Sequence, residues 1–247
     1  MNDIEQNTFT VGFTDVDPSD RLKLSAVCDY FQEAAINHAE KLGMGRSAMA
    51  QTGEVWMLSR LNVLMERRPK YRETITVRSW PRGSEKLFAI RDYDILDENG
   101  KPIVRGRSGW LIVDIEKHRP LRPQEKVTKL PLNAGLDALP LLTNIGLRDG
   151  LKLAGERTPF YSDIDYNGHV NNSRYVQWIQ DITEPDVLEK ADRIRLDINY
   201  ASETHFKETT ELWAIPIENG FAYEGRRNGG IVFRAELGIF QEKEIRK

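Results

Sequence analysis

The chain has 247 residues, of which 30% are charged and 40% are hydrophobic, a composition that fits one large or two small globular domains with an apolar core. Its formal net charge of −3 argues against a nucleic-acid-binding protein, whose affinity depends on cationic contacts with phosphates. A single cysteine, no apolar run long enough for a membrane helix and no signal-peptide pattern favour a cytoplasmic protein without disulfides.

The first half of the chain predicts one helix followed by strands. After a short predicted strand around residues 9–13, apolar side chains recur at helical spacing, at Leu24, Val27, Phe31, Ala35, His38 and Leu42. Residues 56–63 and 74–80 alternate β-branched or aromatic side chains with polar ones, which predicts strands. Asn99-Gly100 between two such runs predicts a hairpin. A helix of this kind can bury its apolar face against the sheet formed by the strands.

The second half predicts the same order of elements. Residues 131–150 contain two prolines and three glycines and predict a linker with room for one helical turn. A short strand is expected around residues 157–161, and a helix follows with Tyr175, Trp178, Ile179 and Ile182 on one face. Residues 231–237 predict a strand, and Asn228-Gly229 predicts the hairpin turn before it.

The two halves also match in three blocks of sequence. Asp15-Val16-Asp17 matches Asp163-Ile164-Asp165, residues 60–63 match residues 195–198, and Asn99-Gly100 matches Asn228-Gly229. The separation between matching residues decreases along the chain because the second copy has shorter connections. Three blocks in the same order indicate an internal duplication.

The second copy carries a polar set at alternate positions, Asp165, Asn167 and His169. In an extended backbone these side chains would point to one face. They would lie beside the start of the predicted helix, whose free N–H groups carry a partial positive charge. A carboxylate, an amide and an imidazole at one spot are suited to holding and transferring protons.

The first copy lacks most of this set. It keeps Asp17 at the position of Asp165 but has Ser19 and Arg21 in place of the amide and the imidazole. A further acid of the second copy, Glu203, corresponds to Arg68. This asymmetry predicts that the second half performs chemistry and that the first half shapes a binding cavity.

Other interpretations of the polar set are weaker. Residues 163–168 resemble the opening of an EF-hand calcium loop, but the twelfth position, which requires a bidentate Glu, is Arg174. Asp165 or Asn167 could cap the next helix, but a cap does not explain His169. No histidine pairs with another histidine or the cysteine at zinc-ligand spacing, so we expect neither a metal site nor a cofactor.

The motif Asp165-x-Asn167-x-His169-Val-Asn-Asn, followed by Tyr175 and Trp178 and then by Tyr200-x-x-Glu203, resembles the acyl-acyl carrier protein (acyl-ACP) thioesterases of plants and bacteria. The similarity covers nearly the whole chain and includes the first-half helix around residues 31–38. It implies an α+β fold with two tandem hotdog domains, each a long helix wrapped by an antiparallel β-sheet. We expect an N-terminal domain at residues 1–130 that forms the substrate cavity, a linker at 131–150 and a catalytic C-terminal domain at 151–247.

The resemblance implies hydrolysis of the fatty acyl-ACP thioester, which releases free fatty acid and holo-ACP and ends chain elongation. Asp165, Asn167, His169 and Glu203 match the catalytic positions of the family. Asp165 would attack the carbonyl carbon, or one of the two acids would activate water. Asn167 would orient the attacking group, and His169 would bind a carboxylate or protonate the departing thiolate. Backbone N–H groups of residues 170–172 would polarise the carbonyl.

A thiol nucleophile is not expected. Plant members of the family tend to have a cysteine directly after the glutamate, where this chain has Thr204. Cys28 belongs to the helix of the first copy and is interpreted as a small buried residue. His38 lies on the apolar face of the same helix and is interpreted as a core histidine.

Trp56, Met57 and Asn171 are the predicted substrate contacts. The basic clusters at residues 67–72 and 117–122 are candidate contacts for an acidic carrier protein, with surface exposure alone as the simpler interpretation. We expect no nucleic-acid partner and no membrane insertion, and both a monomer and a homodimer are compatible with the sequence. The alternatives are an acyl-CoA thioesterase, a non-catalytic hotdog sensor of acyl thioesters, and a hotdog dehydratase, whose usual His and Asp arrangement differs from this motif.

Overall fold

The computed structural model describes residues 3–133, 135–140 and 142–241. Its helices are α1 (Leu24–Lys41), α2 (Arg46–Gln51), α3 (Gln124–Val127), α4 (Asn172–Asp181) and α5 (Pro185–Glu189), with the short 3-10 helices η1 (Phe13–Asp15) and η2 (Tyr161–Asp163). Its strands are β1 (Glu5–Thr10), β2 (Glu54–Met65), β3 (Thr74–Glu85), β4 (Phe88–Leu96), β5 (Pro102–Asp114), β6 (Arg119–Leu121), β7 (Lys152–Arg157), β8 (Arg193–Tyr200), β9 (Thr210–Ile217), β10 (Gly220–Arg227) and β11 (Gly230–Phe240). Among the described residues, no helix combines the length and the apolar composition needed to cross a membrane.

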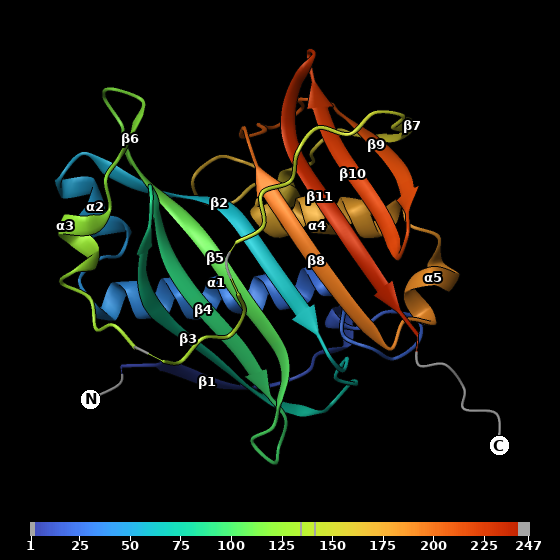
Figure 1. Ribbon diagram of the computed structural model, residues 1–247, viewed down its shortest axis with the longest axis horizontal. Helices are drawn as coiled ribbons and strands as arrows, with labels where there is room; N and C mark the ends of the chain where they lie inside the picture. The colour runs from blue at the N-terminus through green and yellow to red at the C-terminus, as the bar shows by residue number, and fades with distance from the viewer. Residues whose placement is uncertain (1–2, 134, 141, 242–247) are drawn as a thin grey trace.

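The strands form one continuous antiparallel sheet in the order β1-β3-β4-β5-β2-β8-β11-β10-β9-β7, with β6 paired to β5. The strands of the second half repeat those of the first half in reverse order, so that β2 and β8, the equivalent strands, meet in the middle. Helices α1 and α4 lie on the same side of the curved sheet (Figure 1). The predicted α+β architecture, with a helix wrapped by an antiparallel sheet in each half, is confirmed.

The β2–β8 pairing shows the duplication at residue level. Asn62 and Asp197 are equivalent residues of the two copies, and they are also direct partners across the two strands. A residue that faces its own equivalent marks a local two-fold axis, which therefore passes between these two side chains. Both are buried, and Asn62 Nδ2 donates a hydrogen bond to Asp197 Oδ1.

The segments before the two helices repeat as well. An isolated antiparallel bridge joins Val16 to Leu22 in the first copy and Ile164 to Val170 in the second. Helices α1 and α4 begin two residues after these bridges. The predicted duplication is confirmed, and the loop with the polar set has a counterpart of the same shape.

Helix α1 buries the face that its spacing predicts. Phe31 is 2% exposed and stacks on Tyr93 with 4.6 Å between ring centroids. A Cβ atom at Gly106 would lie 2.3 Å from the Phe31 ring, so this position of β5 accommodates the ring only because it is glycine. The helix ends where Leu42 donates to the His38 carbonyl and Gly43 adopts a φ of +66°, a conformation that favours glycine.

Both predicted hairpins are confirmed, at Asn99-Gly100 between β4 and β5 and at Asn228-Gly229 between β10 and β11. Asn228 and Gly229 both have positive φ angles, 50° and 76°, as a two-residue type I′ turn requires. The predicted positions of the first strand of each half were wrong by a few residues. Strands β1 and β7 end at Thr10 and Arg157, and Phe13 and Tyr161, the last residues of the two predicted segments, belong to η1 and η2.

The described residues between 131 and 150 contain no helix, and one hydrogen bond of a turn, from the Leu136 amide to the Asn133 carbonyl at 3.2 Å, is present. This segment crosses the face of the sheet opposite α1 and α4 (Figure 1). Trp80 Nε1 donates to the Leu136 carbonyl at 2.9 Å, Asn199 Nδ2 donates to the Thr143 carbonyl at 3.0 Å, and Asn199 Oδ1 accepts from the Ile145 amide at 2.9 Å. The segment is therefore hydrogen-bonded to strands of both halves.

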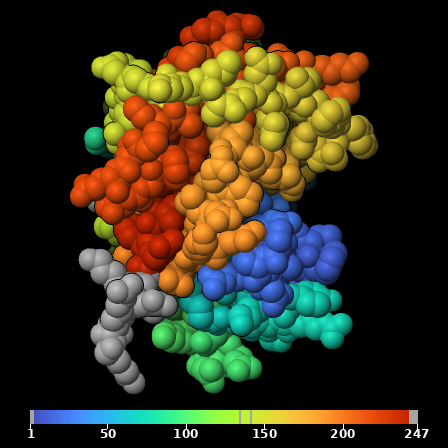
Figure 2. Space-filling view, turned by 90° about the vertical axis from the view of Figure 1, so that its right-hand side faces the viewer, coloured from blue at the N-terminus to red at the C-terminus, as the bar shows by residue number. Residues whose placement is uncertain are grey.

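One hydrophobic cluster includes buried residues from both halves. On the side shown in Figure 2, the orange segment that contains α5 lies against the blue segment around η1. Arg21 Nη1 donates to the Ala191 carbonyl at 3.1 Å, and Arg68 Nη1 donates to the Leu188 carbonyl at 3.0 Å. These contacts fix the two copies against each other, and Arg174 near the start of α4 donates to Asp29 of α1 at 3.3 Å.

Candidate active site

The predicted polar set lies on a tight turn between Ile164 and Val170. The Asp165 amide donates to the His169 carbonyl at 2.9 Å, and Asp165 Oδ1 accepts from the Asn167 amide at 2.8 Å. Gly168 has a φ of +83°. The prediction of an extended backbone was therefore wrong, because the Asp165 carboxylate and a left-handed glycine close a turn here. The side chains of Asp165, Asn167 and His169 nevertheless line one cavity.

The start of α4 differs in part from expectation. The Asn171 side chain caps the helix, with Oδ1 accepting from the Ser173 amide at 2.9 Å and from its hydroxyl at 3.0 Å. The amides of Val170 and Asn171 donate to the carbonyls of Thr204 and Asp163, so these two do not face a substrate carbonyl as predicted. In the described chain no hydrogen-bond acceptor is found for the Asn172 amide. Asn172, rather than Asn171, lines the cavity.

Glu203 meets the turn from the segment after β8. Its Oε2 lies 3.2 Å from His169 Nε2, and both side chains are partly exposed. The structure thus brings Glu203 together with His169, as the sequence motif implied, although 34 positions separate them. Among the described residues, no side-chain hydrogen bond or ion pair joins the Asp165 carboxylate to His169 or Glu203, but all three residues line the same cavity.

His205 is a neighbour that the sequence interpretation missed. Its ring lies 4.7 Å from the His169 ring in an edge-to-face arrangement. One donor atom each of His169, Glu203 and His205 lie within 4.8 Å of one another. Two imidazoles and a carboxylate are ligands that Zn²⁺ accepts, so these three residues are the group at this site that could hold a metal ion. The histidine spacing alone gave no sign of this group, because Glu203 and the fold bring it together.

Thr204 anchors the Glu203 segment. It is fully buried, its carbonyl accepts from the Val170 amide at 2.8 Å, and its amide donates to the Tyr175 hydroxyl at 3.1 Å. Burial raises the pKa of Tyr175 to about 12, so the phenol keeps its proton at neutral pH. The backbone of Thr204, the residue after Glu203, therefore joins Val170, the residue after His169, to Tyr175 of α4.

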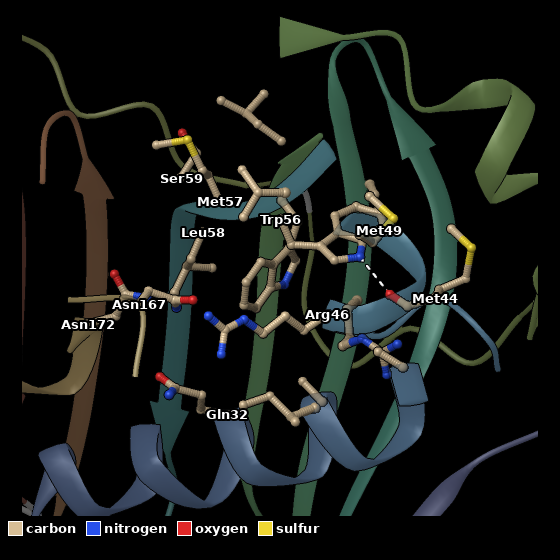
Figure 3. A pocket seen from close by; sticks show the side chains of 18 of the residues that line it. Gln32, Met44, Arg46, Met49, Trp56, Met57, Leu58, Ser59, Asn167 and Asn172 are labelled. Carbon is tan, nitrogen blue, oxygen red and sulfur yellow. Dashed lines mark hydrogen bonds between the residues drawn. The ribbon is translucent and has the colours of Figure 1, made fainter. Parts of the chain in front are cut away.

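The cavity has a volume of about 460 Å³ and extends from the polar set into the first half of the chain. The predicted contacts Trp56 and Met57 line it, and Trp56 Nε1 donates to the Met44 carbonyl at 2.8 Å. Figure 3 shows these residues on β2 above Gln32 of α1, with Asn167 and Asn172 at one side. The cavity is also lined by apolar residues of the first half, namely Ala35, Ile36, Ala39, Leu42, Met49, Val55, Leu58, Ile90, Trp110, Leu111, Val127 and Leu130.

The equivalent loop of the first copy forms a buried ion pair. Arg68 Nη2 donates to Asp17 Oδ2, and Asp17 Oδ1 accepts from the Ser19 amide and hydroxyl at 2.9 and 2.7 Å. Burial acts to raise the pKa of Asp17, but the hydrogen bonds from Ser19 and Arg68 together with the Arg68 charge lower it below its ordinary value. This carboxylate is held by structural partners, so the first copy offers no counterpart of the polar set.

Cys28 and His38 lie where the sequence predicts. Cys28 is buried in α1, and burial raises the pKa of its thiol. His38 is 1% exposed. One member of the first basic cluster, Arg68, is also buried, which corrects its assignment as a candidate contact for a carrier protein.

Comparison with protein families gives two matches in tandem. Residues 2–130 match the acyl-ACP thioesterase N-terminal domain, and residues 152–233 match the acyl-ACP thioesterase C-terminal domain. The fold and the loop define a tandem hotdog protein, and these matches, which cover most of the chain, are specific to one group of such proteins. The chain belongs to the acyl-ACP thioesterase family.

Individual relatives are distant in sequence. The chain is 26% identical over 218 residues to a chloroplastic palmitoyl-acyl carrier protein thioesterase of Cuphea hookeriana, with 80% of this chain and 51% of that protein covered. It is 27% identical over 214 residues to a chloroplastic dodecanoyl-[acyl-carrier-protein] hydrolase of Cinnamomum camphora, with 80% and 56% covered. The chain spans about half the length of the curated relatives it matches.

Solved structures share the fold over nearly the whole chain. An acyl-ACP thioesterase from Bacteroides thetaiotaomicron has a TM-score of 0.84 at 25% identity, with 96% of this chain and 98% of that chain covered. A 12:0-ACP thioesterase from Umbellularia californica has a TM-score of 0.80 at 22% identity, with the same two coverages. The tandem hotdog architecture predicted from the sequence is confirmed.

Proposed function

We propose that this protein hydrolyses the thioester of fatty acyl-ACP and releases free fatty acid and holo-ACP, which ends chain elongation. The observation that carries the proposal is the position of Asp165, Asn167, His169 and Glu203 at one end of a largely apolar cavity. Such a cavity suits an acyl chain, and a carboxylate with nearby proton-transfer groups suits attack on a thioester carbonyl.

The proposed roles follow from the contacts. Asp165 attacks the carbonyl carbon and forms a mixed anhydride, while the carbon–sulfur bond breaks and the thiolate leaves. Glu203, held against His169 at 3.2 Å, takes a proton from the water that hydrolyses the anhydride. His169 gives a proton to the leaving thiolate. Asn167 orients the attacking group, and the free amide of Asn172 polarises the carbonyl.

The same proposal assigns the two domains and the partner. Residues 1–130 form the domain that contributes most of the cavity, residues 131–150 form the linker, and residues 151–247 form the domain with the catalytic residues. The remaining candidate contacts for an acidic carrier protein are the exposed basic residues at positions 117–122 together with Arg67, Lys70 and Arg72. The single, buried cysteine fits a reducing compartment, and we place the protein in the cytoplasm.

The test is release of free fatty acid from matched acyl-ACP and acyl-CoA thioesters by the wild type, Asp165→Asn and Glu203→Gln. We expect turnover of acyl-ACP, and a loss of at least about a hundredfold in kcat for each variant. Asp186→Asn is a suitable control because Asp186 is an exposed carboxylate of the same half that pairs with Lys190 at 2.7 Å and does not line the cavity. Melting temperatures establish that all variants are folded.

Each other outcome has a distinct meaning. Turnover of CoA thioesters alone would keep the chemistry and exclude the carrier-protein partner. Binding of both thioesters without hydrolysis would make the protein a sensor. Wild-type turnover by a folded Asp165→Asn variant would refute the role of Asp165 as the attacking group.

A further inference from the structure

Arg91 of β4 is a cation inside the otherwise largely apolar cavity. Its side chain lines the cavity together with the polar set of the other half. Desolvation lowers the pKa of Arg91, although the guanidinium stays charged at neutral pH. In the part of the chain that the structure describes, no carboxylate forms an ion pair with it. Glu5, the acid whose charge acts on it, is bound instead by Lys41 at 2.7 Å.

The hydrogen bonds of Arg91 leave one edge of the guanidinium free. Nη1 bonds to Ser79 Oγ at 3.0 Å and to His38 Nδ1 at 3.1 Å. Among the described residues, Nε and Nη2 of Arg91 have no acceptor, yet neither is one of the buried polar atoms that lack a partner. These donors therefore retain accessible surface, and the cavity is the space that the residue lines.

The free edge is the one that binds carboxylates elsewhere in this chain. Nε and Nη2 of Arg107 donate to the two oxygens of Asp92 at 2.7 and 2.8 Å, and the same two atoms of Arg78 hold Asp94. A carboxylate matches this pair of parallel N–H groups, and such charge-assisted pairs are among the stronger hydrogen bonds in proteins. A desolvated guanidinium without an anion is correspondingly unfavourable.

The strand that carries Arg91 is separated by two other strands from β8, which leads to Glu203. The sheet order runs from β4 through β5 and β2 to β8, and Glu203 follows the end of β8. Three spacings of about 4.8 Å give roughly 14 Å between β4 and β8. An acyl chain whose thioester lies at Asp165 and Glu203 would thus bring its distal end, rather than its carbonyl, to Arg91.

We propose that the cavity accepts acyl chains that end in a carboxylate, and that this terminal carboxylate binds the Nε and Nη2 atoms of Arg91. The inference rests on the proposed function, since it names the class of acyl chain that the same site takes. His38 and Ser79 hold the guanidinium in position from the far side and leave its carboxylate-binding edge to the ligand.

The test compares acyl-ACP substrates of graded length, each plain or with a terminal carboxylate or hydroxyl group. Wild type, Arg91→Met and Arg91→Lys are measured, with Arg105→Met as the matched control because Arg105 is a partly exposed arginine of the adjacent strand β5 that contacts Glu66. We expect kcat/KM to favour the carboxylated chain at the best length. The ratio of carboxylated to plain kcat/KM should fall at least about tenfold in Arg91→Met and remain unchanged in Arg105→Met. Arg91→Lys keeps the charge but loses the pair of parallel N–H groups, so its ratio should lie between those of the wild type and Arg91→Met.

Binding of pantetheine amides, in which nitrogen replaces the scissile sulfur, gives a readout that needs no turnover. The carboxylated amide should bind wild type at least about tenfold more tightly than the plain amide, and Arg91→Met should remove the difference. Equal ratios in wild type and Arg91→Met, or a wild type that rejects carboxylated chains, would overturn the inference. A preference for the hydroxyl chain over the carboxylate would also overturn it. Failure of all thioesters to react would refute the proposed function, and amide binding would still decide the role of Arg91.

Discussion

Replacing Tyr175 by Phe tests how the proposed Glu203–His169 pair is held. The Tyr175 hydroxyl accepts from the Thr204 amide at 3.1 Å, and no other acceptor for that amide is found among the described residues. Tyr175 is 3% exposed and Thr204 is fully buried, so the variant leaves a buried N–H group unsatisfied, at a cost of about 1–3 kcal/mol. For a chain of this size, each kcal/mol corresponds to roughly 2–4 °C in melting temperature.

The same loss should reduce turnover, because Thr204 adjoins Glu203 and its carbonyl holds Val170, which adjoins His169. A displacement of the pair by a fraction of an ångström to 1 Å should lower kcat about 10- to 100-fold. The assay is steady-state release of fatty acid, together with the melting temperature and the free energy of unfolding in urea. A rise in KM alone would indicate a binding role instead.

Tyr223→Phe is the matched control for this variant. Tyr223 is also 3% exposed, and its hydroxyl bonds to Thr183 Oγ1 at 2.7 Å in the same half of the chain, but it does not line the cavity. We expect a similar loss of stability and an unchanged kcat. Equal kcat values for Tyr175→Phe and Tyr223→Phe at equal stability would refute the proposed positioning through Thr204.

Three further changes test the fold. Desolvation and the nearby arginine lower the pKa of His38 below 6.5, so the unfolded state binds more protons below that pH. The free energy of unfolding should therefore fall as the pH decreases from about 6.5. His38→Gln should lack this part of the pH dependence in urea unfolding, and an identical dependence of the unfolding free energy on pH would contradict the reasoning. Gly106→Ala should cost about 1–3 kcal/mol, because its Cβ would lie 2.3 Å from the Phe31 ring, and unchanged calorimetric stability would contradict that clash. Asp197→Ala should cost about 1–3 kcal/mol, because it removes a buried acceptor of Asn62, as urea unfolding would measure.

Much of the fold follows from local sequence signals. The face of α1 follows from its apolar spacing, and the β10–β11 hairpin follows from Asn228-Gly229 because few residue pairs tolerate two positive φ angles. The continuous sheet was not predictable in this way. The pairing of β2 with β8 depends on long-range packing, although the duplication had already matched Asn62 with Asp197.

The sequence predicted which residues form the polar set of the candidate site, but not the conformation of their backbone. Alternation suggested an extended segment, whereas the Asp165 carboxylate and Gly168 form a turn. His205 and Arg91 carried no signal in sequence, because their positions beside His169 and inside the cavity arise from tertiary structure. A motif lists residues with fixed spacing and therefore cannot include neighbours that come from elsewhere in the chain.

The asymmetry between the copies explains how one cavity can serve one site. Helix α1 has 18 residues and α4 has 10, so α1 extends roughly 12 Å farther along the sheet. The cavity continues along this longer helix, toward α2, whereas the polar set lies at the start of the shorter one. In the first copy Arg68 occupies the position of Glu203 and binds Asp17 and three carbonyls, including that of Leu188 in the other half. Asp17, which has neither the amide nor the imidazole that accompany Asp165, is thus part of the contact between the halves. That contact holds the cavity of one copy against the polar set of the other.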